Sequence, residues 1–258
     1  LGLGGAEMCI RDRSVGVAQE AYNEALTYAK ERQQFGQAII EFPAVYDMLS
    51  RMKAKLDAGR SLLYQTARYV DLYKALEDIQ RDRKLSAEER AEMKKYTRLA
   101  DAFTPLAKGM NSEYANHNAY DAISIHGGSG FIMAYKCQRL FRDARIFSIY
   151  EGTTQLQVVA AIRYIMNGTY LNIMKEMLDK EVEGTWKPLH DRLKVLAQQY
   201  EEAVNMVKEA DNQELQDFLA RRLYNMTANL LMSVLLIDDA SRAPELFGKS
   251  AHVYMRHT

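Results

Sequence analysis

Hydrophobic residues recur every three or four positions along most of the chain, which is the spacing of one face of an α-helix. The first such stripe predicts a helix over about residues 14–34 that ends near Gly36, and it consists of Val17, Ala21, Ala25 and Tyr28. β-branched alternation is scarce and the chain has only 4 prolines, so the pattern favours helices nearly throughout.

Proline and capping signals place the next two helices. Pro43 suits the first turn of a helix that continues to about Leu72, and residues 73–85, charged and aperiodic, are predicted to be an exposed connection. Ser86 and Glu89 form a Ser-x-x-Glu capping box. We expect a long third helix from there to Gly127–Gly128, kinked or interrupted at Pro105.

The remaining pattern predicts two shorter helices and then a change of domain. The shorter helices cover about residues 135–144 and 153–167, and residues 167–170 read as a boundary. Further helical segments follow near residues 171–180, 189–209, 213–239 and from 245 onward. The predicted fold class is therefore all-α, with a helical bundle over residues 14–168 and a second helical domain over residues 169–258.

The first residues look foreign to this fold. Residues 7–13 read EMCIRDR, which resembles a translated sequencing adapter. We expect residues 1–13, with Cys9, to be a non-native leader and the chain to be a fragment that lacks its natural N-terminal part. The sequence after Met255 has no stop signal, which allows truncation at that end too.

Charge and composition narrow the classes of function. Lys plus Arg number 34 and Asp plus Glu number 34, so the zero net charge argues against nucleic acid or an anionic membrane as partner and permits self-association. The apolar run Leu230–Ile237 is too short to span a bilayer. Two cysteines, Cys9 and Cys137, provide neither a disulfide framework nor a four-ligand zinc site, so we expect a cytoplasmic protein without a metal.

Two stretches contain groups that suit a phosphate. Arg32 precedes Phe35 and Gly36, and a guanidinium can clamp two phosphate oxygens, although a basic residue there also complements a helix C-terminus. Gly127 and Gly128 let a backbone approach a ligand closely, although a Gly pair is also an ordinary helix cap. Taken alone, each stretch favours the structural interpretation, and the neighbouring His126 is expected to be a packed residue.

Two later stretches carry charge beside apolar residues. Residues 142–145, Arg-Asp-Ala-Arg, are read as a structural ion-pair cluster. In residues 149–155, Glu151 lies between Tyr150 and Gly152 just before a helix, where apolar neighbours could raise its pKa toward working pH. Alternatively, Glu151 is only a favourable charge near a helix N-terminus that Thr153 or Thr154 caps.

The four stretches together, in this order, resemble the C-terminal helical bundle of the acyl-CoA dehydrogenases over about residues 14–168. The resemblance implies that Glu151 is the catalytic base and that Tyr150, Glu151 and Gly152 contact substrate. It also implies that FAD binds through two groups of residues: Thr153 and Gln155 for one subunit's own cofactor, and Arg32, Phe35, Gly127 and Gly128 for that of a neighbour.

That resemblance implies α,β-dehydrogenation of an acyl-CoA thioester in fatty-acid metabolism, with hydride passing to flavin N5. It further implies a homodimer or tetramer and an electron-transfer flavoprotein as acceptor. Ser124 stands where many members have Gln, which puts a hydrogen bond to the adenosine part in doubt. The charged segment and the extension after Gly168 resemble larger members, such as enzymes acting on 3-methylmercaptopropionyl-CoA, without fixing the substrate.

Three alternatives remain open at this level. Acyl-CoA oxidases and alkylation-response flavoproteins share the fold, and the zero net charge disfavours the DNA-associated type. A non-enzymatic helical oligomerisation module would also explain the amphipathic helices. The family's N-terminal and β-domains are absent from this chain, so we expect the chain alone neither to hold FAD firmly nor to turn over.

Overall fold

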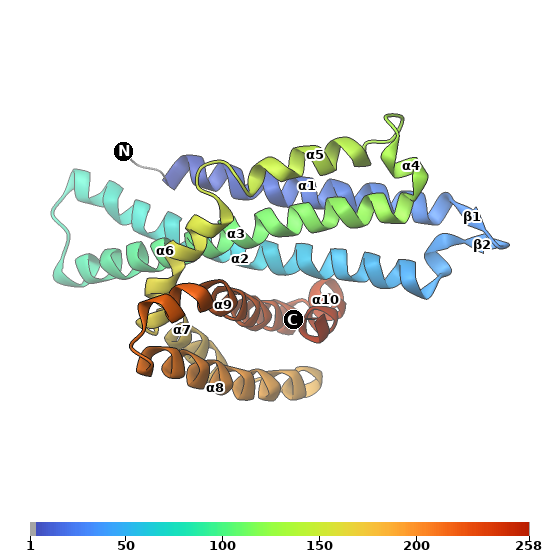
Figure 1. Ribbon diagram of the computed structural model, residues 1–258. Helices are drawn as coiled ribbons and strands as arrows, with labels where there is room; N and C mark the ends of the chain where they lie inside the picture. The colour runs from blue at the N-terminus through green and yellow to red at the C-terminus, as the bar shows by residue number, and fades with distance from the viewer. Residues whose placement is uncertain (1–3, 258) are drawn as a thin grey trace.

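Three long helices lie side by side and form the body of the molecule in a computed structural model that describes residues 4–257, with side chains described from Arg13 onward (Figure 1). The bundle helices are α1 (Gly4–Glu31), α2 (Pro43–Asp82), α3 (Ala87–His126), α4 (Gly128–Phe131), α5 (Cys137–Phe147) and α6 (Thr154–Met166). The extension consists of α7 (Thr169–Leu178), α8 (Lys187–Glu209), α9 (Gln213–Arg242) and α10 (Pro244–His257). Short 3-10 turns cover Ile39–Glu41 and Gly184–Trp186. The predicted all-α class is confirmed.

Small residues allow the bundle helices to approach closely. Ala21, Ala25 and Ala29 of α1 are fully buried, and α1 packs against α3, where Ala115 and Ala119 are fully buried too. Their spacing of four residues puts each set on one face. One apolar core lies among α1, α2, α3 and α5, and a second lies among α2, α3 and the helices from α6 onward, so α2 and α3 serve both.

The first predicted helix ends earlier than expected. α1 stops at Glu31, and β1 (Gln33–Gln34) pairs antiparallel with β2 (Gln37–Ala38). Phe35 and Gly36 at the turn have φ of 50° and 81°, as a tight two-residue hairpin requires. The interpretation of Gly36 as a helix cap is wrong, because it belongs to this turn. At the other end α1 begins at Gly4, while the side chain of Cys9 lies outside the described residues; the non-native leader remains a prediction.

The segment expected to connect two helices is itself helical. α2 continues through residues 73–82 to Asp82, because this stretch contains good helix formers and an Asp78–Arg81 ion pair of 2.8 Å one turn apart. The segment is largely exposed, as predicted. The chain then turns, and the Ser86–Glu89 capping box starts α3 as predicted.

Pro105 neither ends nor interrupts α3, which runs unbroken from Ala87 to His126. The side chain of Tyr224 in α9 donates a hydrogen bond of 2.9 Å to the carbonyl oxygen of Pro105. Tyr170 of α7 donates to the carbonyl oxygen of Ala102 in the same stretch. The extension therefore makes hydrogen bonds to α3 around its proline.

Polar side chains join the extension to the bundle. Asp57 of α2, almost fully buried, accepts from Lys53 and from Ser250 of α10. Ser61 donates to Asp239 of α9. Among the helices described, none combines the length and the apolarity that crossing a bilayer requires.

Candidate functional site

Glu151 lies in a tight turn between α5 and α6 with a left-handed backbone. Its φ is 49°, and the φ of Gly152 is 92°. The turn is held by a hydrogen bond of 3.1 Å from the amide of Thr154 to the carbonyl oxygen of Ser148. Thr153 then caps α6 by accepting from the amide of Leu156 at 3.3 Å. A left-handed backbone at a residue other than glycine costs about 1–3 kcal/mol. The backbone strain in this turn therefore lies at Glu151, the candidate base.

A buried lysine donates a hydrogen bond to the backbone of this turn. Lys108 of α3 is 2% exposed, and its ammonium group donates a hydrogen bond of 2.5 Å to the carbonyl oxygen of Gly152. A Cβ added to Gly152 would lie 2.9 Å from Nε2 of Gln157, the movable end of a side chain, so the φ of 92° rather than the available space favours glycine there. Sequence reasoning missed Lys108, although its spacing of seven residues before the buried Ala115 places it on the inner face of α3.

Within this chain Glu151 is not enclosed by the apolar neighbours that the sequence suggested. Glu151, Thr153 and Gln155 are exposed in this chain. Tyr150 is half-buried against the ring of Phe147, with 6.1 Å between centroids, but the carboxylate stays open to solvent. The described residues alone therefore do not exclude water from Glu151.

Arg32 and Phe35 lie on the hairpin after α1. Phe35 is 92% exposed and its ring contacts Phe42 edge-on at 6.2 Å. The side chain of Arg32 is exposed and makes no hydrogen bond or ion pair within the described part of the chain. An exposed cation beside an exposed aromatic ring is available to a ligand or a second polypeptide.

The paired glycines lie where α3 ends. Gly127 has φ of 59°, and the space around the Cα atoms of Gly127 and Gly128 is open. His126 is buried, stacks on Tyr28 of α1 at 4.1 Å and bonds to the carbonyl oxygen of Ala122 at 2.8 Å, so its expected packing role is confirmed. Because Tyr28 of α1 stacks on His126, the turn at Gly127–Gly128 lies at the same end of the bundle as the β1–β2 hairpin that follows α1 (Figure 1).

Within one chain, Glu151 is remote from that end. α5 has 11 residues, or about 16 Å of helix, and it separates the glycine turn from the Glu151 turn (Figure 1). The structure thus groups the predicted residues into two clusters, one at the hairpin end and one at the start of α6. In the third stretch, Arg142 and Asp143 form an exposed pair of 3.8 Å.

Two family models cover the chain. The model for the C-terminal domain of acyl-CoA dehydrogenase matches residues 3–166. A second model, described as acyl-CoA dehydrogenase C terminal, matches residues 166–258.

Curated relatives match the first part of the chain. A caffeyl-CoA reductase–Etf complex subunit, CarC of Acetobacterium woodii, is 39% identical over 148 residues, which cover 57% of this chain and 33% of that protein. The 3-methylmercaptopropionyl-CoA dehydrogenase of Ruegeria pomeroyi is 37% identical over 161 residues, which cover 59% and 25%. The match thus spans about a third or less of the length of these relatives.

A solved structure matches nearly the whole chain. The acyl-CoA dehydrogenase of Bacillus anthracis, complexed with FAD, superposes with a TM-score of 0.76 at 23% identity, over 99% of this chain and 46% of that one. At this identity the likeness concerns the fold, including the extension from α7 to α10.

Proposed function

Because the chain belongs to the acyl-CoA dehydrogenase family, we propose that the protein carrying it dehydrogenates an acyl-CoA thioester between its α and β carbons. The observation that carries this proposal is Glu151, held in a left-handed turn at the start of α6 and flanked by Tyr150 and Gly152. A strained backbone at Glu151, with the carbonyl group of the next residue held by Lys108, suits a catalytic role better than a capping role.

In this proposal, Glu151 removes the proton from the carbon next to the thioester carbonyl. Its backbone amide donates a hydrogen bond to the thioester oxygen. This bond makes the α-carbon more acidic and so reduces the difference in pKa between the α-carbon and the carboxyl group. Since Glu151 is exposed within the described residues, water exclusion has to come from the substrate and from other parts of the whole protein.

The hairpin end has the features that suit a dinucleotide. Arg32 has no partner in the described chain, and open space adjoins Gly127 and Gly128, so a guanidinium and a close backbone approach are both available to a pyrophosphate. Arg32, Phe35, Gly127 and Gly128 would hold FAD bound to a neighbouring subunit, whereas Thr153 and Gln155 would contact FAD beside Glu151. When bound, FAD supplies the hydride acceptor.

This division between two clusters requires at least a dimer, because one chain keeps them apart. We propose a homo-oligomer in the cytoplasm, with an electron-transfer flavoprotein as electron acceptor. An acyl-CoA oxidase of the same fold is the second candidate, since it needs the same base.

The test uses the full-length protein. Under anaerobic conditions, addition of acyl-CoA should bleach the flavin absorbance, and electron-transfer flavoprotein should then restore it. A protein that contains FAD but is bleached by no acyl-CoA would contradict the dehydrogenation. Rapid reoxidation by oxygen with release of peroxide would identify the oxidase instead. The chain of 258 residues alone should neither retain FAD nor react.

A further inference from the structure

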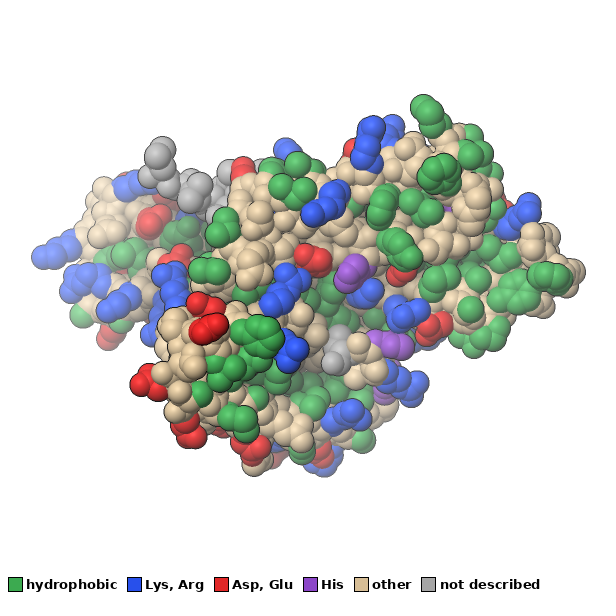
Figure 2. Space-filling view, viewed as in Figure 1, with side chains coloured by type: hydrophobic (Ala, Val, Ile, Leu, Met, Phe, Trp, Pro, Cys, Tyr) green, Lys and Arg blue, Asp and Glu red, His purple; other side chains and the backbone are tan. Residues whose placement is uncertain are grey.

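A cavity between the bundle and the extension lies apart from both clusters. Its volume is about 300 Å³, and α2, α3, α9 and α10 each contribute to its walls. Figure 2 shows histidine and basic side chains along the junction of the two helical groups. A cavity of this size falls at the small end of ligand pockets.

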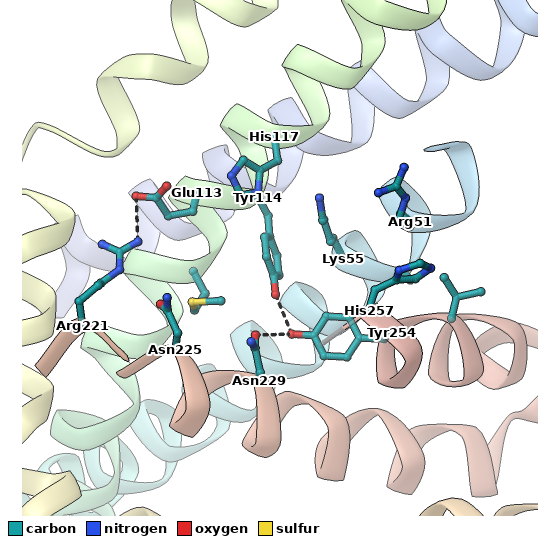
Figure 3. A pocket seen from close by; sticks show the side chains of 13 residues that line it. Arg51, Lys55, Glu113, Tyr114, His117, Arg221, Asn225, Asn229, Tyr254 and His257 are labelled. Carbon is teal, nitrogen blue, oxygen red and sulfur yellow. Dashed lines mark hydrogen bonds and ion pairs between the residues drawn. The ribbon is translucent and has the colours of Figure 1, made fainter. Parts of the chain in front are cut away.

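Lys55 is the central cation of this cavity (Figure 3). It is half-buried and makes no hydrogen bond or ion pair within the described residues. Loss of hydration lowers the pKa of Lys55, while the more distant Asp121 counteracts this and Arg51 adds to it. A partly desolvated ammonium group that donates to no acceptor is a costly arrangement, which a bound anion would relieve.

Other charged groups line the cavity on either side of Lys55. Arg51 pairs with Asp47 at 3.0 Å, but its buried Nε atom has no hydrogen-bond partner. The guanidinium group of Arg221 lies 3.7 Å from the carboxylate of Glu113. At this distance the pair is weak, so Arg221 is able to turn toward a ligand. The residues that line the cavity carry three cations and one carboxylate, while Asp47 and Asp121, which act on Arg51 and Lys55, stand outside the lining. The inner wall therefore presents mainly donors and positive charge, as a phosphate group requires.

The floor of the cavity is polar and already ordered. The hydroxyl groups of Tyr114 and Tyr254 are 2.6 Å apart, and Tyr254 donates to Oδ1 of Asn229 at 3.2 Å (Figure 3). This leaves the Nδ2 donors of Asn229 and of the neighbouring Asn225 for a ligand. Val253 and Met110 add apolar contact for an organic part.

We infer that the cavity is a binding site for a small phosphate compound, held by Lys55 between Arg51 and Arg221 and resting on Asn225 and Asn229. The ligand would bridge α2 and α3 to α9 and α10. It would therefore stabilise the junction of the two helical groups by binding the folded state alone.

The test is calorimetric titration of the FAD-loaded full-length protein, in which the hairpin end is already occupied, with inorganic pyrophosphate at constant ionic strength. We expect saturable binding, and a loss of affinity of at least about tenfold in Lys55→Met, since a charge-assisted hydrogen bond is removed. Lys74→Met, an exposed lysine on the same helix, should bind as the wild type does. Lys55→Arg should retain most of the affinity.

Thermal unfolding provides the second measurement and shows whether the variants fold. Lys55→Met should melt at or above the wild-type temperature, because it removes a desolvated charge. Pyrophosphate should raise the melting temperature of the wild type and of Lys74→Met, but not that of Lys55→Met. Absence of saturable binding, equal binding by Lys55→Met, or equally tight binding of succinate would each overturn the assignment.

Discussion

The ammonium group of Lys108 in α3 donates a hydrogen bond to the carbonyl oxygen of Gly152, directly after Glu151 in the chain. The bond connects the most buried part of the long helix to the turn that carries the proposed base. Burying a lysine is costly unless its charge finds acceptors, so this residue is expected to position the turn and not only to fill the core.

Replacement of Lys108 should therefore affect turnover more than substrate affinity. In the full-length protein, Lys108→Met is expected to lower the rate of flavin reduction by about 10- to 100-fold, because a displacement of the base by about 1 Å has effects of that size. Lys108→Arg should recover part of the rate. Stopped-flow reduction over a range of acyl-CoA concentrations separates kcat from KM. A change confined to KM would show that Lys108 does not position Glu151.

The glycines of α1 and α3 offer a matched test of the packing between bundle and extension. A Cβ on Gly109 would collide with the hydroxyl group of the fully buried Tyr224, whereas one on Gly16 meets nothing within 4 Å. Gly109→Ala should lower the free energy of unfolding by about 1–3 kcal/mol, and Gly16→Ala should leave it unchanged or raise it by up to about 1 kcal/mol. Chemical denaturation measures both, and similar effects of the two variants would contradict this packing.

Asp239 should make the stability of the junction depend on pH. Burial raises the pKa of Asp239, and the neighbouring Asp238 adds to this against the hydrogen bond from Ser61 and the charge of Arg242. The native state thus holds the proton more tightly than the unfolded state, and stability is lost as pH rises through the native pKa. Asp239→Asn avoids that loss, so its melting temperature should exceed that of the wild type at pH 7.

The same comparison at acid pH provides the control. Near pH 4 the advantage of Asp239→Asn should be smaller than at pH 7, because a larger fraction of the wild-type carboxyl is protonated in the native state there. Differential scanning calorimetry at both pH values gives the two differences, each expected to be below about 3 °C for one partly exposed group. An equal difference at both pH values would mean that the ionisation of Asp239 is not responsible.

Arg32 should matter for the cofactor and not for the fold. Its side chain is exposed and has no partner in the described residues, so Arg32→Met should melt within about 1 °C of the wild type, as surface substitutions usually do. The full-length variant should retain less FAD after gel filtration. Unchanged FAD content, measured from the ratio of flavin to protein absorbance, would argue against a pyrophosphate contact.

Much of the fold follows from local signals, and the departures have physical causes. The Ser86–Glu89 box consists of short-range hydrogen bonds, so the sequence pattern located it correctly, and it narrowed the cap of α6 to Thr153 or Thr154, of which Thr153 is the one observed. The continuation of α2 beyond Leu72 was not predicted, and of the two outcomes expected at Pro105, a kink or an interruption, α3 shows no interruption. The continuation carries Leu72, Leu76 and Ile79 at helical spacing, but the charged residues between them made the segment look aperiodic. Around Pro105 the contact from Tyr224 joins residues more than a hundred positions apart, which no local pattern shows.

The candidate site was predictable only in part. Glu151 and the paired glycines became candidates because their residues form recognisable strings, whereas Lys108 was passed over because a lone lysine in a helix is usually solvated. Whether apolar neighbours enclose Glu151 could not be judged from composition, since water exclusion depends on which surfaces cover the turn.

The most direct test of the proposed function compares Glu151→Gln with Asp143→Asn, an exposed carboxylate on α5, in the FAD-loaded full-length protein. Anaerobic stopped-flow mixing with acyl-CoA measures the rate of flavin bleaching in a single turnover. Glu151→Gln is expected to lose about 10²- to 10⁴-fold in this rate while it still binds acyl-CoA, and Asp143→Asn should react as the wild type does. Bleaching at the wild-type rate in Glu151→Gln would contradict the assignment of Glu151 as the base.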